Sequence, residues 1–347
     1  MATAKNTWEN RESEKRLFDE KVRRLDAQVK SFGAARSPLT LSIDAERIVA
    51  AGDQIYAIPN DWGFRDFMLS YGLDRLGRAI VDAEPDRNNP RHPIAAALLT
   101  SSAYAVDGEN GKMRLIGTDP GLFGFLKISY DLFTVADNAH LQEEMIKRLK
   151  QNDQNFRGAR YELFVAASLI RAGFSVEFEN ESDSSKSHCE FTAKDKLSGK
   201  AFSVEAKCRN HSGERKGAKV YRLLQKALQK DADHERIIFL DVNMRPDTKP
   251  LFKEPWQKEI METVSELERA QKRERPWPQA IVFFTNRLLP GWEHEIEGTG
   301  TTLLTAINHP LFMTNDRRAV EATYPEIGKL FGAVQDKANP PEHFFGQ

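Results

Sequence analysis

The chain has 347 residues, of which 40% are hydrophobic and 29% are charged, and its formal net charge is −1. Because this charge is close to zero, no global basic field draws the whole surface onto nucleic acid, and any such contact needs a local basic patch. The sequence has neither an apolar run of about 18 residues nor an apolar core near its start, so we expect a cytoplasmic protein.

Residues 1–150 have a mostly helical pattern. Phe18, Val22, Leu25 and Val29 recur at helical spacing in a charged segment, and Gly33 follows as a stop signal. We find no chemical motif in this region. It is therefore predicted to act as a sensor, a docking surface or a substrate-binding region, and the sequence leaves these alternatives open.

Further elements are expected before residue 150. A second helix is predicted from Asp61, its cap, to Tyr71, and a third begins at Pro93. A longer helix is expected over 124–150. The turn residues of 106–117 indicate a hairpin or a loop between these helices.

The polar segment 151–155 is the expected boundary of a second region, 151–310, in which helices and strands alternate. This alternation predicts an α/β fold with a mixed central sheet. Residues 311–347 are expected to form an irregular tail. The expected helices cover 156–172, 218–230 and 256–271, and the expected strands cover 175–178, 189–193, 202–208, 237–242, 280–284 and 302–306.

Residues 189–208 are predicted to form a hairpin with its turn near Gly199. If Glu190 is paired with Glu205, alternation places Cys189 and Cys208 on an apolar face, where we expect small buried hydrophobic residues. The opposite face then carries Glu190, Glu205 and Lys207. Two carboxylates and an ammonium group indicate a site for a hard divalent cation, with the lysine beside it. The alternative is a solvated strand face with an incidental salt bridge.

The preceding helix adds a third acid. Glu162 lies on the stripe of Val165, Ala166 and Leu169, which faces the core. A carboxylate on such a stripe is costly unless it is paired or bound. It therefore either forms a salt bridge with Arg157 or Arg160, or converges with the hairpin acids on one cation.

The order of these elements resembles the PD-(D/E)xK nuclease superfamily, which has a restriction-endonuclease-like αβββαβ core. The match covers roughly 156–245, with Glu190 in the position of the usual aspartate and Glu205-x-Lys207 as the E-x-K pair, 15 residues after Glu190 and 43 after Glu162. The resemblance implies that Glu162, Glu190 and Glu205 bind Mg²⁺, with Mn²⁺ as a substitute, and that Lys207 assists catalysis. Glutamate at position 190 departs from the family pattern.

A basic segment follows the E-x-K strand. Residues 207–230 contain eight basic residues and one acid, Glu214. Such a segment beside a cation site suits a phosphate backbone, and the alternative is a solvated helix face. By the resemblance, Arg222 or Gln225 also supports the site. The predicted substrate-binding residues are Arg209, Arg215, Lys216, Lys219, Arg222 and Gln225.

We therefore expect a Mg²⁺-dependent endonuclease that hydrolyses phosphodiester bonds, most naturally those of DNA, in restriction, defence or repair. A catalytically inactive nucleic-acid-binding or scaffold protein with the same fold is the alternative. A component of a larger complex is a third, resting on fold analogy. The N-terminal region could then support a homodimer or hold a partner protein, and no membrane contact is expected.

Overall fold

The computed structural model describes most of the chain. The described residues are 2–83, 91–101, 104–106, 113–115, 120–141, 143–151, 154–179, 189–209, 217–243, 255–270, 276–286, 302–314, 316–336 and 339–344. Within them, no helix is both long enough and apolar enough to cross a membrane.

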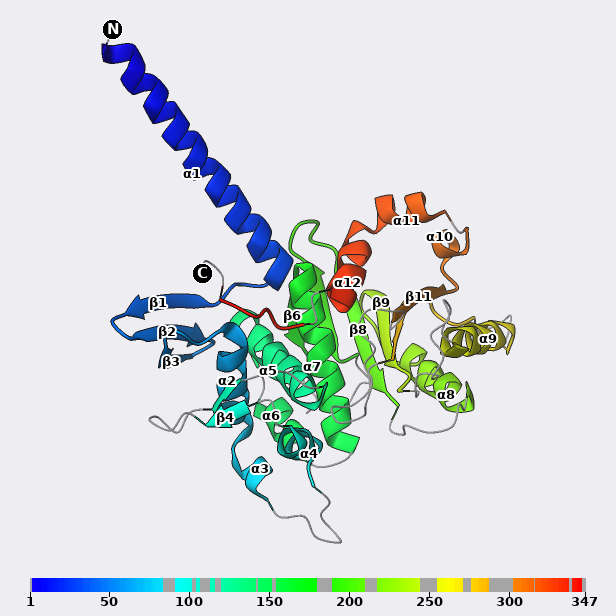
Figure 1. The fold of residues 1–347 in the computed structure, drawn as a ribbon. Coiled ribbons are helices and arrows are strands. Elements are labelled where there is room, and N and C mark those ends of the chain that lie inside the picture. The colour runs from blue at the N-terminus through cyan, green and yellow to red at the C-terminus, as the bar shows by residue number, and fades with distance from the viewer. Residues whose placement is uncertain are drawn as a thin grey trace.

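A six-stranded mixed sheet forms the centre of the fold (Figure 1). Its order is β11-β10-β9-β8-β7-β6, in which β8, β9 and β10 are parallel and the other neighbours are antiparallel. The expected α/β class and mixed sheet are thus confirmed. The strands are β6 (Phe174–Phe178), β7 (Phe191–Asp195), β8 (Ala201–Cys208), β9 (Glu235–Asp241), β10 (Ala280–Thr285) and β11 (Thr302–Ile307).

Helices cover both faces of the sheet. On one face, α7 (Gln154–Ala172) packs in the larger hydrophobic cluster with Val204, Phe239 and Phe283 of the strands. On the other face, α8 (Gly217–Leu228) and α9 (Pro255–Ala270) enclose alternate residues of the same strands, including Ile238 and Val282. Because successive side chains of a strand point to opposite faces, the continuous apolar runs of β9 and β10 contribute to two separate apolar layers.

The N-terminal region contains a three-stranded antiparallel sheet that the mostly helical prediction missed. Its strands are β1 (Leu39–Ile43), β2 (Glu46–Ala51) and β3 (Gln54–Pro59). Asp44 and Gly52 occupy the turns with φ of 51° and 63°, in the left-handed region that tight hairpin turns require. The burial of β2 alternates along the strand, whereas all residues of β1 are exposed.

The helices of the N-terminal region agree in part with the expectations. The first helix and its stop at Gly33, which has a φ of 63°, are confirmed. The helix starting at Pro93 is also confirmed, whereas the helix expected over 124–150 is two helices. The described helices are α1 (Ala2–Phe32), α2 (Phe64–Leu76), α3 (Ala79–Asp82), α4 (Pro93–Thr100), α5 (Pro120–Asn138) and α6 (Glu143–Lys150).

The start of the second helix and the hairpin or loop predicted for 106–117 can also be compared with the structure. The second helix begins after Gly63 rather than at Asp61, and the Asp66 carboxylate accepts the Gly63 N–H at 2.8 Å. The expected hairpin forms from β4 (Tyr104–Val106) and β5 (Met113–Leu115), which pair antiparallel. The turn between these strands lies outside the described residues.

The two predicted regions share one core. The larger hydrophobic cluster runs from Phe32 through the N-terminal helices and the central sheet to Phe344. A buried ion pair joins the regions, because Arg171 of α7 lies 2.7 Å from Asp131 of α5. Buried pairs of this kind fix the relative position of two elements more than they add net stability.

The C-terminal segment is helical, so the prediction of an irregular tail is wrong. It forms α10 (Pro310–Met313), α11 (Arg317–Thr323) and α12 (Pro325–Asp336). Ile327, Leu330 and Val334 of α12 are buried in the larger cluster. Their 3–4 spacing is the amphipathic signal that the aromatic and proline residues of this segment obscured.

Candidate active site

The β7–β8 hairpin has the register that the sequence led us to assume. Phe191 pairs with Val204 and Thr192 with Ser203, and Glu190, just before β7, donates its backbone N–H to the Val204 carbonyl at 3.0 Å. The turn is closed by Asp195, whose carboxylate accepts the N–H groups of Leu197 at 3.2 Å and Ser198 at 2.7 Å. The hairpin therefore brings the two acids close together at two inner strands of the sheet.

Glu190, Glu205 and Lys207 form one ion-pair cluster. The Lys207 Nζ lies 3.0 Å from Glu190 Oε1 and 2.5 Å from Glu205 Oε1. The Glu205 side chain is 1% exposed, whereas those of Lys207 and Glu190 are 24% and 18% exposed. The cluster thus carries two carboxylates for one ammonium group, with its most buried charge on Glu205.

The environment of Glu205 changes its acidity. Burial raises the pKa of this carboxyl group from 4.5 to about 7; Lys207 opposes the increase and Glu190 adds to it. For Lys207, burial acts to lower the pKa, but attraction to Glu205 and Glu190 outweighs it, so the net pKa is raised. Lys207 is therefore a charged hydrogen-bond donor at neutral pH, and Glu205 titrates near neutrality.

Glu162 of α7 lies near Glu190, because both side chains line the same pocket. It is 8% exposed on α7, and Arg148 of α6 binds it in a bidentate manner, with Nη1–Oε2 and Nη2–Oε1 distances of 2.8 and 2.6 Å. The sequence predicts Arg157 or Arg160 as the salt-bridge partner of Glu162, whereas the bidentate partner in the structure is Arg148. Its pairing depends on how α6 packs on α7, which no local sequence pattern reveals.

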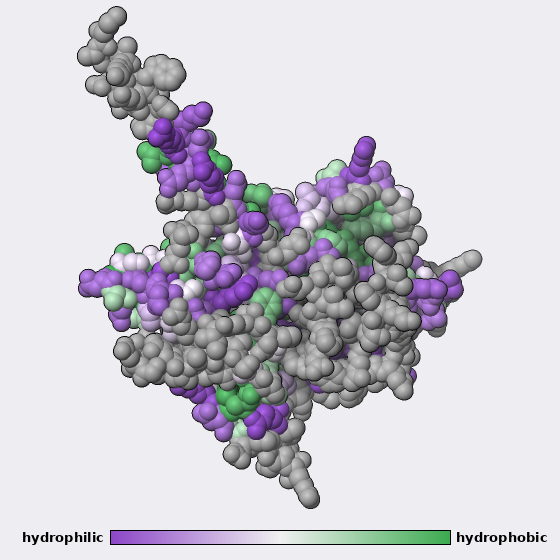
Figure 2. Space-filling model, in the orientation of Figure 1, coloured by the Kyte–Doolittle hydropathy of each residue, from purple (hydrophilic) through white to green (hydrophobic). Residues whose placement is uncertain are grey.

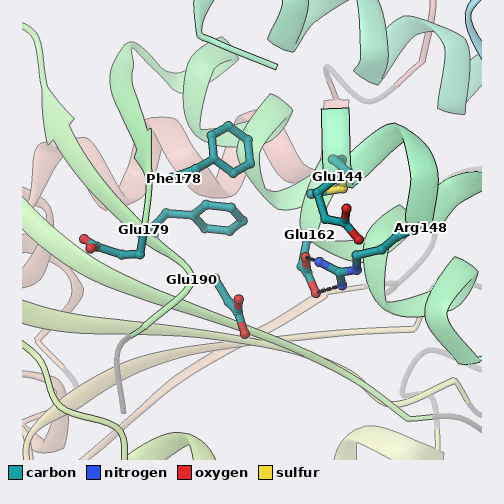
Figure 3. A pocket seen from close by; sticks show the side chains of 8 residues that line it. Glu144, Arg148, Glu162, Phe178, Glu179 and Glu190 are labelled. Carbon is teal, nitrogen blue, oxygen red and sulfur yellow. Dashed lines mark hydrogen bonds and ion pairs between the residues drawn. The ribbon is translucent and has the colours of Figure 1, made fainter. Parts of the chain in front are cut away.

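A small pocket connects Glu162 with Glu190 (Figure 3). The Arg148 guanidinium lies against Glu162, and Glu190 lies across the pocket from this pair. Because Glu190 also pairs with Lys207, it links the pocket to the buried Glu205. The lining residues are Glu144, Met145, Arg148, Glu162, Phe178, Glu179, Glu190 and Phe191.

Glu205 provides the test of whether these residues fit a divalent cation. Lys207 approaches it closely, but both carboxylate oxygens of Glu205 are buried without a properly directed hydrogen bond from the described residues. Such a carboxylate can accept a cation together with Glu190. The third predicted ligand, Glu162, is held by Arg148, and no three acidic, histidine or cysteine residues in the described parts of the chain form a ready-made cation site.

The predicted phosphate contacts divide into three groups. Arg209 is 3% exposed, and its Nη1 donates to the Val242 carbonyl at 3.4 Å, so its guanidinium lies inside the fold rather than on a basic surface. On α8, Arg222 is exposed and Gln225 is half-buried. Arg215 and Lys216 lie outside the described residues, and only the backbone of Lys219 is described.

Buried polar groups also meet at the carboxyl ends of the parallel strands. Thr285 Oγ1 donates to Asp241 Oδ1 at 3.0 Å and lies 2.9 Å from the Tyr161 hydroxyl of α7. Cys208 at the end of β8 and Cys189 before β7 both have a pKa raised chiefly by burial, to about 12 for Cys189. These thiols therefore stay protonated at neutral pH. Cys189 is buried, as the sequence predicts, whereas Cys208 is half-buried.

Comparison of the chain with protein-family models, with curated proteins and with solved structures finds no match. The fold and the site define the protein as a mixed α/β protein with a Glu–Lys–Glu cluster at the inner strands β7 and β8 of its sheet. Its function must therefore be argued from this cluster.

Proposed function

We propose that this protein is a divalent-cation-dependent nuclease of the PD-(D/E)xK type that hydrolyses phosphodiester bonds in DNA. The observation that carries the proposal is the cluster of Glu190, Glu205 and Lys207. Glu205 is almost fully buried, and the Lys207 ammonium group, 2.5 Å from Oε1, is the one polar side chain that the described structure places beside its carboxylate oxygens. A protein tolerates such a costly arrangement chiefly at a functional site.

The order of the elements supports the same proposal. Helix α7 is followed by the antiparallel strands β6, β7 and β8, then by α8 and by β9, which is parallel to β8. This is the αβββαβ order of a restriction-endonuclease-like core. The acids occupy the first helix, the residue just before the second strand and the third strand of that order.

The cation would be held by Glu190 and Glu205, and Glu162 would join them after it releases Arg148. When bound, it would lower the pKa of a water molecule and offset charge that develops on the phosphate. Magnesium suits this oxygen-rich set, and manganese is the expected substitute.

Lys207 has a role that follows from its charge. Since its pKa is raised, it stays protonated and cannot serve as a general base near neutral pH. Its Nζ can instead donate hydrogen bonds that orient the attacking water or a phosphate oxygen. Glu205, which shares the ammonium group with Glu190, fixes the position of that donor.

The substrate side of the proposal is based on α8. Arg222 and Lys226 are exposed one turn apart on this helix, whose opposite side packs Val220, Leu224 and Ala227 into the core. Exposed cations on a rigid helix beside the acidic site suit a nucleic-acid backbone. We propose DNA as the nucleic acid, and cleavage of RNA in its place would revise the substrate alone.

A cleavage assay tests the function. Wild-type protein is incubated with plasmid and with linear DNA in magnesium, alongside the Glu205→Gln and Lys207→Ala variants and a chelator control. Glu177→Gln is the matched control, because Glu177 is an exposed glutamate of β6 in the same sheet. We expect cleavage by the wild type and Glu177→Gln only; equal cleavage by all four proteins would sink the assignment.

A non-cleaving nucleic-acid-binding protein is the second candidate. It is favoured by the bidentate hold of Arg148 on Glu162 and by glutamate, in place of aspartate, at position 190. Calorimetric titration distinguishes the two. DNA binding without magnesium binding or cleavage supports the second candidate, whereas magnesium binding that Glu205→Gln abolishes supports the nuclease.

A further inference from the structure

The exposed apolar side chains of the molecule gather near its N-terminus. Of the twelve large hydrophobic side chains that are exposed among the described residues, nine lie between Leu17 and Ile55. Five of them are on α1, which stands away from the rest of the fold in Figure 1. Figure 2 shows these hydrophobic side chains among polar ones on the described part of this helix.

Helix α1 has little support from its own chain. Its last turn is anchored, because Phe32 is 1% exposed and packs edge-on against Phe64, and the Tyr130 hydroxyl donates to the Ser31 carbonyl. From Lys15 to Lys30 its described side chains are exposed, apart from the half-buried Asp19 and Gln28. Since helices in proteins are stabilised mainly by packing of an apolar face, a 31-residue helix of this kind needs a partner surface.

The apolar residues of α1 follow a heptad pattern. Phe18, Val22, Leu25 and Val29 are separated by four, three and four residues, and Phe32 follows three residues later. This spacing assigns Val22 and Val29 to position a and Phe18 and Leu25 to position d. A β-branched residue at a with leucine at d favours a parallel, two-stranded coiled coil.

The charges of Lys21 and Asp26 beside this seam favour parallel pairing with a second copy of the same chain. Lys21 falls at position g, and Asp19 and Asp26 fall at position e. In a parallel dimer, position g of one helix faces the following e of its partner, so Lys21 of each chain would meet Asp26 of the other, while Glu14, the preceding g residue, would meet Asp19. In an antiparallel dimer the e positions face each other, which would bring aspartates together.

We propose that α1 forms a parallel, in-register, two-stranded coiled coil with a second copy of this chain, through the seam of Phe18, Val22, Leu25 and Val29. The symmetry makes the interface self-complementary, with two Lys21–Asp26 pairs flanking one apolar seam. The two folded bodies then lie side by side at the ends where Phe32 anchors each helix. This inference does not depend on the proposed nuclease function.

The first experiment measures the mass of the full chain by sedimentation over a range of concentrations. We expect twice the chain mass of 39.4 kDa for the wild type. Leu25→Lys, in the seam, should raise the dissociation constant at least about tenfold. Leu17→Lys is the matched control, because Leu17 is 58% exposed and Leu25 is 60% exposed on the same helix, but Leu17 lies outside the seam.

The second experiment tests the orientation by exchanging charges. Lys21→Glu or Asp26→Lys alone should weaken the dimer, and the double variant should restore it, which an antiparallel pair does not predict. A wild-type monomer, or equal weakening by Leu17→Lys and Leu25→Lys, would overturn the proposal. A dimer that resists Leu25→Lys but is lost in Leu41→Lys would also overturn it, and would place the interface on the exposed face of β1.

Discussion

Replacing Glu205 with glutamine should stabilise the protein while it abolishes the proposed activity. Burial raises the pKa of Glu205 from 4.5 to about 7 in the folded chain. Keeping this carboxylate ionised therefore costs the fold about 3 kcal/mol, at about 1.4 kcal/mol for each tenfold change in proton affinity. Glutamine has nearly the same shape and carries no charge, so it removes that cost.

The effect should depend on pH with a defined sign. The folded pKa lies above the unfolded one, so the folded state binds the extra proton between pH 4.5 and about 7. The wild type should therefore lose stability relative to Glu205→Gln as pH rises through this window. Below pH 4.5 this carboxyl group should make no difference between the free energies of unfolding of the two proteins. Above about pH 7 the difference should reach a constant value.

Urea unfolding in the presence of a chelator measures this difference. We expect Glu205→Gln to gain about 2–3 kcal/mol over the wild type at pH 8 and almost nothing at pH 4.5. Glu177→Gln, on the exposed side of β6, should change little at either pH. A difference in unfolding free energy that does not change with pH would refute the claim that ionised Glu205 destabilises the fold. A glutamine variant less stable than the wild type at pH 8 would refute it as well.

Three further substitutions have distinct expected outcomes. Lys207→Met should destabilise the protein by about 3–5 kcal/mol at pH 8, because it leaves buried carboxylate charge without its partner; unfolding by urea that is unchanged there would contradict the ion pair. Arg148→Ala should cost about 1–3 kcal/mol by leaving the carboxylate of Glu162 without its bidentate donor, and the same variant with Glu162→Gln should recover part of this loss in a double-mutant cycle. Gly72→Ala should lower the melting temperature and cost about 1–3 kcal/mol, since the added Cβ would lie 2.0 Å from Ser129 Oγ; a variant as stable as the wild type would show that α2 and α5 separate readily.

The sequence predicts the central sheet well because its signals are local. The strands from Phe174 to Thr285 alternate or run apolar between clear breaks, and each appears within a few residues of its expected bounds. The hairpin register could be inferred because turn geometry and the apolar face of β8 constrain it together. The sequence pattern did not reveal the three strands within 39–59, because they are short, rich in alanine and isoleucine, and lie between helices.

The candidate site was predictable only as far as one hairpin reaches. Alternation along β8 forces Glu205 and Lys207 onto one face, and the hairpin brings Glu190 within 3.0 Å of Lys207. The ion pair between Glu162 and Arg148 joins two helices whose packing no local pattern specifies. The burial of Arg209 depends likewise on how β8 ends beside Val242.

The most direct test of cation binding by Glu190 and Glu205 is a crystal structure of the protein soaked in manganese. We expect an anomalous peak within coordination distance of Glu190 and Glu205, with Lys207 still beside the bound ion. We expect no such peak in Glu205→Gln crystals. A cluster in which Lys207 keeps both carboxylates and no manganese peak appears would contradict the claim that these residues hold a catalytic cation.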